Sequence, residues 1–178
     1  MVTVDPTQPA TPMVLVMMGV SGCGKSTVAA LLAGRLGWPL EEGDDLHPAS
    51  NVEKMAAGHP LTDADRAPWL RKVAAWVEHQ LDAGQSGVVT CSALKHSYRD
   101  VINRRGSGIL FVYLSGDRET IAARLAARQG HYMPARLLDS QFGDLEEPGP
   151  DEPSITLNVG PPAAVITQNI LDQLKAAV

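Results

Sequence analysis

A glycine-rich run that ends in lysine and two hydroxyl residues has the composition of a polyphosphate site. Residues 19–27 read GVSGCGKST and match G-x-x-x-x-G-K-[ST] at every fixed position. Glycines allow backbone N–H groups to curl around phosphate oxygens, because no Cβ stands in the way. We therefore expect Lys25 to reach the β- and γ-phosphates and Ser26 to hold Mg²⁺. The candidate nucleotide-binding residues of this loop are Gly19, Val20, Ser21, Gly22, Cys23, Gly24, Lys25, Ser26 and Thr27.

Two acidic residues follow the expected second strand, in Glu42-Gly-Asp-Asp45. A carboxylate at a strand's C-terminal end can orient an acceptor hydroxyl and hold a metal ion. Asp44 is the candidate base and, with Ser26, a candidate metal ligand, although Asp45 beside it could share the role. The N-K-x-D and D-x-x-G strings of a GTPase are absent, and the strands at 87–91 and 109–114 are not followed by the acid expected of a motor or AAA-type ATPase. These patterns favour a small-molecule kinase.

Basic and polar residues gather in three further stretches. The first, between residues 44 and 71, supplies His47, Lys54 and Arg66 among acids and amides, a mixture that suits a polyhydroxylated anion. The second supplies Lys95 and Arg99, which four-residue spacing would place on one face of a helix. For each of these residues, an ordinary solvated surface position is the alternative interpretation.

The third stretch resembles the base of a lid. Arg124 and Arg128 are four residues apart near the end of an expected helix, and Gln-Gly-His131 follows. Arginine at such a place can neutralise a transferring γ-phosphoryl group. The alternative is a pair of cations placed favourably at a helix C-terminus.

The elements that would position these residues alternate along the chain. Short apolar runs predict buried strands, and periodic apolar positions predict helices. Strands separated by helices imply a parallel sheet covered on both faces. We expect an α/β P-loop NTPase fold with about five parallel strands and a helical lid. The predicted strands are 13–18, 40–43, 87–91, 109–114 and 155–159, and the predicted helices are 26–36, 63–83, 95–103, 117 to about 128, and 162–177.

Composition narrows the class of protein. The 178 residues suffice for one domain, expected at 13–178, after a proline-rich disordered tail at 1–12. A formal net charge of −5 argues against a nucleic-acid partner, and no apolar run is long enough to span a membrane. Cys23 and Cys91 lie far apart without CxxC spacing, which is typical of a reduced, cytoplasmic chain. We interpret Cys23 as a substitute for serine in the loop rather than as a redox thiol.

Several strings occur together in a fixed order: GVSGCGKST, GDDLHP, N-x-x-K-M, GHPLTDADRAPWL, CSALKHSYRD, RLAARQGHYM, LLDSQF and LEEPGPDE. In this order they resemble gluconokinases of the P-loop type, in the shikimate-kinase-like group. The resemblance covers about residues 13–178. The patterns DxDRxPWL and CSALKxxYRD separate this family from shikimate, adenylate and adenylylsulfate kinases. Small departures are Cys23 where serine is usual, Asp45 beside Asp44, and Tyr132 where phenylalanine is common.

The resemblance implies phosphorylation of D-gluconate at its 6-hydroxyl by ATP with Mg²⁺, in a homodimer. It implies that Asp44 lies nearest the acceptor hydroxyl. Arg124 would stack on adenine against the loop near 158–161, and Arg128 would reach the phosphates. The catalytic residues would then be Lys25, Asp44 and Arg128. The candidate contacts for gluconate and the transferred phosphate are Asp44, His47, Lys54, Arg66, Lys95, Arg99 and His131.

Two other functions stay open at this point. The first is a kinase of the same fold that acts on another small sugar acid or polyol. The second is a non-catalytic ATP-binding regulator. Intact Lys25, Ser26, Asp44 and Arg128 argue against a regulator, because a degenerate site would be expected to lose some of them.

Overall fold

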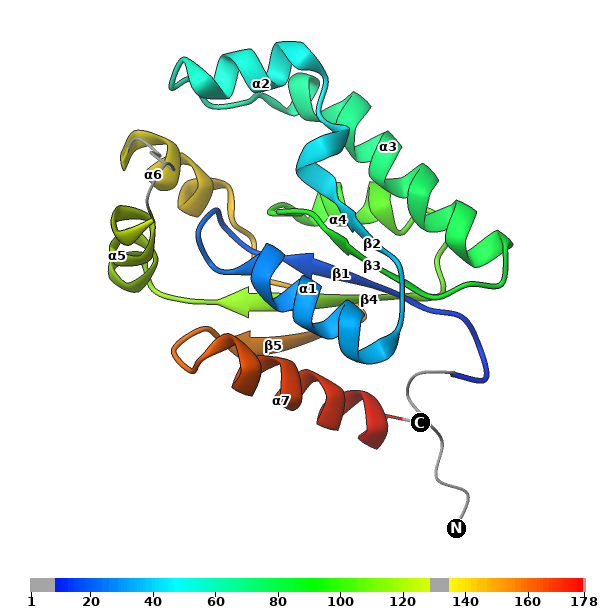
Figure 1. Ribbon diagram of the computed structural model, residues 1–178. Coiled ribbons are helices and arrows are strands. Elements are labelled where there is room, and N and C mark those ends of the chain that lie inside the picture. The colour runs from blue at the N-terminus through cyan, green and yellow to red at the C-terminus, as the bar shows by residue number, and fades with distance from the viewer. Residues whose placement is uncertain (1–8, 129–134, 178) are drawn as a thin grey trace.

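Five parallel strands form one sheet in the order β2-β3-β1-β4-β5 (Figure 1). The structure is a computed structural model that describes residues 9–128 and 135–177. β1 lies at the centre, since Val14 is in register with both Gly87 of β3 and Ile109 of β4. This sheet confirms the predicted fold class. The strands are β1 (Val14–Met18), β2 (Leu40–Glu42), β3 (Gly87–Thr90), β4 (Ile109–Ser115) and β5 (Ser154–Asn158).

Helices cover both faces of the sheet. Figure 1 shows α1 and α7 on one face and α3 and α4 on the other. All five predicted helices are present to within two residues at their ends, whereas η1, α2 and α6 were not predicted. The described helices are α1 (Lys25–Leu36), η1 (Gly43–Leu46), α2 (Ala49–Ala56), α3 (Asp63–Asp82), α4 (His96–Ile102), α5 (Arg118–Ala127), α6 (Ala135–Asp144) and α7 (Ala163–Ala176).

The central position of β1 in the sheet explains why its sequence is apolar without alternation. Leu15 and Met17 pack into the cluster that contains residues of α1 and α7. Val14, Val16 and Met18 pack into the opposite cluster, with residues of α3 and α4. All five side chains are fully buried. A strand with both faces covered needs apolar residues at every position, as a central parallel strand does.

Local signals fix several helix ends. Thr62 and Asp65 form a reciprocal capping box at the start of α3. The predicted cap of α5 is confirmed, because Asp117 accepts a hydrogen bond from the Thr120 N–H at 2.7 Å. No helix among the described residues is long and apolar enough to cross a membrane. Most of the tail predicted at 1–12 lies outside the described residues.

The parallel sheet brings the carboxyl ends of all its strands to one edge. In Figure 1, the helices α5 and α6 lie at this end, beside the loop between β1 and α1. The expected lid falls between these two helices, and residues 129–134 are outside the described part of the chain. In open α/β sheets this edge is where ligands bind.

Candidate active site

The loop between β1 and α1 has the geometry of a phosphate-binding loop. Lys25 folds back over it, and its Nζ donates hydrogen bonds to the carbonyls of Gly19 at 2.8 Å and Val20 at 3.0 Å. Gly22 adopts a φ of +83°, and a Cβ there would lie 2.6 Å from Leu125 of α5. Only glycine fits this turn, since both its backbone conformation and the close approach of α5 exclude a side chain.

Glu42 connects this loop to the ends of β2 and β3. Its Oε2 accepts a hydrogen bond from Ser26 Oγ at 3.0 Å and another from Thr90 Oγ1 at 2.6 Å. The Gly43 N–H in turn donates to Thr90 Oγ1 at 3.1 Å. A Cβ on Gly43 would lie 1.9 Å from the Thr90 carbonyl oxygen, so glycine is required for β2 to end this close to β3. The contacts hold the Glu42 carboxylate beside the hydroxyl predicted to bind a metal ion.

A cavity of about 560 Å³ opens between this loop and the acceptor wall formed by η1, α2, α3 and α6. Asp44 lines the cavity, whereas its neighbour Asp45, which the structure also describes, does not. The geometry thus favours Asp44 in the role that the sequence left open between the two. The predicted site residues that the cavity brings together are Ser21, Gly22, Gly24, Lys25, Ser26, Asp44, His47, Arg66 and Arg128.

The remaining residues of the glycine-rich loop take other positions. Val20 and Cys23 are buried in the core, so only their backbone groups can serve a ligand. Cys23 is 1 % exposed, in keeping with a packing role rather than a redox role. Burial raises the pKa of the other thiol, Cys91, to about 12, so it is inert at neutral pH. Gly19 and Thr27 are not among the residues that line the cavity.

His47 is held as a neutral ring against Trp69. The two ring centroids are 4.0 Å apart and their planes differ by 17°. Asn51 Nδ2 donates to the Asp65 carbonyl at 2.9 Å and lies 3.2 Å from His47 Nδ1. Because the carbonyl can only accept, the amide NH₂ faces Nδ1, and the ring proton is assigned to Nε2. Burial lowers the pKa of His47, an effect that Asp44 opposes and Arg66 reinforces.

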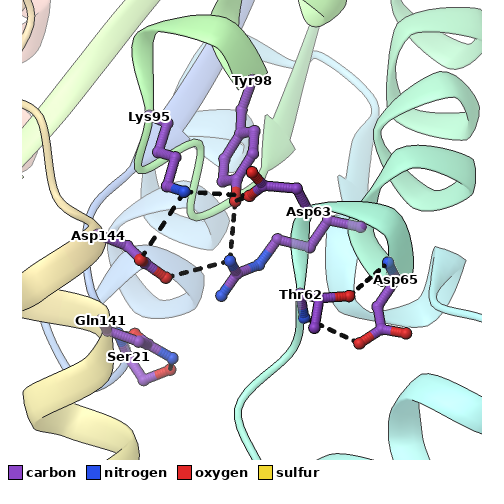
Figure 2. Close-up of polar contacts among 9 residues, drawn as sticks. Ser21, Thr62, Asp63, Asp65, Lys95, Tyr98, Gln141 and Asp144 are labelled. Atoms are coloured by element: carbon purple, nitrogen blue, oxygen red, sulfur yellow. Dashed lines mark hydrogen bonds and ion pairs between the residues drawn. The ribbon is translucent and has the colours of Figure 1, made fainter.

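Arg66 and Lys95 lie in one polar cluster beside the cavity (Figure 2). Arg66 is 7 % exposed. Its Nη1 donates to the Tyr98 hydroxyl at 2.9 Å and to Asp144 Oδ2 at 3.1 Å. Lys95 Nζ donates to Asp63 Oδ1 at 3.1 Å, and Tyr98 donates to the same oxygen. Of these two cations, Arg66 lines the cavity and Lys95 does not.

Arg99 was predicted to contact the acceptor, and that prediction is wrong. Its guanidinium is buried and makes a double hydrogen bond to Glu152, at 2.5 Å from Nε and 3.1 Å from Nη2. The remaining Nη1 donates to the carbonyls of Ala93 and Leu94. The expected shared face with Lys95 does not form, because Lys95 is the extended N-cap of α4 and not a helical residue. Arg99 stabilises the fold behind the site.

Lys54 also lies away from the cavity. Its Nζ is 2.6 Å from Asp65 Oδ2. This hydrogen bond, followed by those of the capping box, lowers the pKa of Asp65 to about 2. Lys54 is not among the residues that line the cavity, so the structure does not place it as a direct acceptor contact. Its ion pair with Asp65 joins α2 to the start of α3.

Arg124 and Arg128, the two arginines predicted to contact the nucleotide, lie at different places. Arg124 donates a hydrogen bond to the Val159 carbonyl, which puts it against the loop at 158–161 as expected. Arg128, the exposed C-cap of α5, lines the cavity. A nucleotide held by the glycine-rich loop would therefore have arginines at two points along its length. His131 lies outside the described residues.

Sequence reasoning missed, among others, Glu42 beside the glycine-rich loop and Gln141 in the cavity wall. Glu42 was noticed only as part of an acidic turn, although its place at the end of β2 was a usable signal. Gln141 of α6 accepts from the Ser21 N–H at 2.7 Å and donates to Ser21 Oγ at 3.0 Å (Figure 2). No local signal pointed to this contact, since 120 residues separate its partners.

Comparisons with known proteins identify the family of the chain. A family model described as an AAA domain matches residues 14–148. A gluconokinase of Gluconobacter oxydans (strain 621H) is 50 % identical over 165 residues, 93 % of each chain. A solved gluconokinase from Sinorhizobium meliloti 1021 has a TM-score of 0.85 and 41 % identity, covering 94 % of each chain. An unliganded sugar kinase from Janibacter sp. HTCC2649 has a TM-score of 0.86 and 43 % identity, covering 92 % of this chain and 94 % of that one.

The AAA-domain match corrects one argument from the sequence. The missing acid after β3 and β4 had spoken against AAA-type proteins, but Glu42 at the end of β2 brings a carboxylate to Ser26 instead. The choice of a P-loop kinase over a GTPase switch is confirmed, because the chain shares both length and fold with gluconokinases. By these matches the chain belongs to the AAA-domain family and, among the P-loop kinases, to the gluconokinase family.

Proposed function

We propose that this chain transfers the γ-phosphoryl group of ATP to the 6-hydroxyl of D-gluconate, giving 6-phospho-D-gluconate and ADP. The observation that carries the proposal is a single cavity lined by Lys25 and Ser26 on one side and by Asp44 and Arg66 on the other. Phosphoryl transfer requires mainly that donor and acceptor be positioned together and that charge be neutralised. The names of the relatives identify gluconate as the acceptor to test.

Mg²⁺ fits the donor set beside the loop. The Ser26 hydroxyl, the Glu42 carboxylate and Asp44 offer oxygen atoms, which this ion prefers. Residues 9–128 and 135–177 contain no group of three histidine, cysteine or acidic side chains able to hold a metal ion. That composition suits an ion held by few protein groups and by substrate phosphates. Mg²⁺, when bound, neutralises charge on the phosphates.

The acceptor hydroxyl is positioned and deprotonated by groups of the acceptor wall. We assign to Asp44 the orientation of the 6-hydroxyl and the late acceptance of its proton. His47, neutral with its proton on Nε2, is suited to donate a hydrogen bond to another hydroxyl of the sugar chain. Lys25 and Arg128 stabilise the negative charge of the transferring group.

Arg66 is the proposed partner of the gluconate carboxylate. It is the largely buried cation of the cavity, and among the described residues only its Nη1 has a hydrogen-bond acceptor. A neutral sugar such as glucose would leave this charge without a partner from the substrate. Only an acidic acceptor can form an ion pair with Arg66, so the site should favour gluconate over glucose beyond what its shape alone gives.

Arg124 is the proposed platform for adenine. Its hydrogen bond to the Val159 carbonyl holds the guanidinium against the loop that follows β5. Planar guanidinium groups stack on aromatic rings, which suits a purine base. The family resemblance also leads us to expect a homodimer, which light scattering would test.

An assay for ADP release tests the proposal directly. ATP and Mg²⁺ are supplied with D-gluconate, and D-glucose, shikimate and D-glycerate serve as alternative acceptors. ADP release that depends on gluconate, with 6-phosphogluconate identified by mass spectrometry, is the expected result. Release with another acid instead would favour a kinase of a different acceptor. Binding of ATP without turnover on any acceptor would favour a regulator.

A further inference from the structure

The cations of the acceptor wall are already paired with a carboxylate of the protein itself. Asp144 is the last residue of α6, and its Oδ2 accepts the hydrogen bond from Arg66 at 3.1 Å. Its Oδ1 lies 4.0 Å from Lys95 Nζ. Figure 2 shows the Asp144 side chain reaching from α6 toward Lys95. An acidic acceptor would thus meet cations that already have an anionic partner.

The charges of this cluster balance. Arg66 and Lys95 supply two positive charges, and Asp63 and Asp144 supply two negative charges. The hydrogen bond from Tyr98, followed by that from Lys95, lowers the pKa of Asp63, so it remains ionised at neutral pH. A second carboxylate brought to Arg66 would lie close to Asp144, and like charges at such distances repel.

Asp144 is the more weakly held of the two carboxylates. Asp63 accepts hydrogen bonds from both Lys95 and Tyr98, and it begins α3, where the helix dipole favours a negative charge. Asp144 ends α6, where the dipole disfavours one. Its side chain is 26 % exposed. Among the described residues, its carboxylate interacts only with Arg66 and Lys95.

The rest of α6 is fixed independently of this carboxylate. Gln141, one turn earlier, makes two hydrogen bonds to Ser21, and Leu137 and Leu138 are buried. A change of side-chain rotamer at Asp144 would therefore be enough to release Arg66. The helix itself need not move.

We propose that Asp144 sets the affinity and charge selectivity of the acceptor site by holding Arg66 until the carboxylate of the acceptor replaces it. The inference rests on the proposed function, because it requires an acidic acceptor. Asp144 then acts against binding, and its effect falls on anionic acceptors alone. A carboxylate that merely oriented Arg66 would have the opposite effect, since its loss would weaken binding.

The test compares Asp144→Asn with the unaltered protein by isothermal titration calorimetry. The probes are D-gluconate and D-gluconamide, which share their hydroxyl groups and differ in charge. Removing the competing charge should lower the Kd of gluconate roughly 3- to 10-fold, the scale of a partly exposed ion pair. The Kd of gluconamide should change less than about 2-fold, because an uncharged ligand does not compete with Asp144.

Three variants control the comparison. Asp144→Glu keeps the charge and should leave gluconate binding close to that of the unaltered protein. Asp139→Asn removes an exposed carboxylate of the same helix, one paired with Arg118, and should change neither Kd. If thermal melting shows that Asp144→Asn is unfolded, Asp144→Ser replaces it in the same comparison.

The possible outcomes separate this inference from the proposed function. Tighter binding of gluconate alone supports the role of Asp144. Unchanged or weaker gluconate binding, or equal tightening of both ligands, overturns it while leaving the kinase activity intact. If the unaltered protein neither binds nor phosphorylates gluconate, the proposed function itself fails.

Discussion

Glu42 accepts a hydrogen bond from Ser26 at 3.0 Å, so the carboxylate that ends β2 directly holds the hydroxyl proposed to bind Mg²⁺. The same oxygen accepts a hydrogen bond from Thr90 at the end of β3. One carboxylate thereby links the end of β2, the end of β3 and the start of α1. The spacing of the glycine-rich loop alone does not reveal this support.

Replacing Glu42 with glutamine should weaken the use of Mg²⁺. The neutral amide cannot offer an anionic oxygen to Ser26 or to the ion's surroundings, and such supporting groups typically contribute 10- to 100-fold in metal affinity or activity. We expect a loss of roughly that size in turnover at limiting Mg²⁺, partly recovered at high Mg²⁺. A Mg²⁺ titration of ADP release measures it. Glu41→Gln is the matched control, since alternation along β2 directs Glu41 to the other face. An unaltered Mg²⁺ dependence in Glu42→Gln would contradict the assignment.

Replacing Lys25 with alanine should abolish most transfer without unfolding the protein. Among the described residues the ammonium contacts only its own loop, through two carbonyls and the Cys23 sulfur, so its loss removes no long-range contact. Loss of one such electrostatic contact to the transferring group costs on the order of 100- to 1,000-fold in turnover. The ADP assay gives turnover, and circular dichroism checks the fold. Lys72→Ala, an exposed change on α3, is the control.

Replacing Asp44 and Asp45 one at a time with asparagine should have different effects on turnover. Asp44 lines the cavity and Asp45 does not, so only Asp44→Asn should lose turnover, by roughly 100- to 10,000-fold for a lost general base. Binding of ATP should persist in both variants. Equal losses in the two variants would show that the neighbouring acids share the role.

The interior pair Arg99–Glu152 predicts an effect on stability rather than on the acceptor. Glu152→Gln leaves a buried guanidinium uncompensated, which typically costs about 3–5 kcal/mol of unfolding free energy. The KM for gluconate should stay within about 2-fold of its normal value, because Arg99 does not line the cavity. Urea unfolding and steady-state kinetics measure the two effects. Glu78→Gln, which breaks an exposed pair with Arg104, should change stability little.

The same pair gives a pH dependence with a definite sign. Burial alone would raise the pKa of Glu152, but hydrogen bonds from Arg99 and the Gly149 N–H hold that pKa below its ordinary value. A carboxyl with a lowered folded pKa stabilises the protein at neutral pH, and this contribution is lost as pH falls through the folded pKa. The stability difference between the unaltered protein and Glu152→Gln should therefore shrink below about pH 4. A difference that grows in acid would contradict this account.

The sequence predicted what short-range patterns encode. The glycine-rich loop, the five strands and the cap at Asp117 all depend on residues close together in the chain. The α2 helix was missed because it spans only eight residues, and the one residue that it buries, Asn51, is polar. The spacing rule for Lys95 and Arg99 failed because α4 begins one residue later than Lys95.

Long-range pairings could not be inferred from such patterns. The contact between Arg66 and Asp144 joins residues 78 positions apart, and Gln141 reaches a loop 120 positions away. Both depend on where α6 packs against distant parts of the chain. A long-range pairing also explains the wrong prediction for Arg99. Glu152, 53 positions later in the chain, binds its guanidinium in the interior, away from the cavity.

The ring stack of His47 on Trp69 provides an optical signal within the acceptor wall. Trp69 lines the cavity, and an imidazole 4.0 Å away alters indole emission when it is protonated or displaced. Arrival of an acceptor at this wall can therefore be followed in stopped-flow fluorescence without an added label. Mixing the acceptor before or after the nucleotide would then reveal the order in which the two substrates bind.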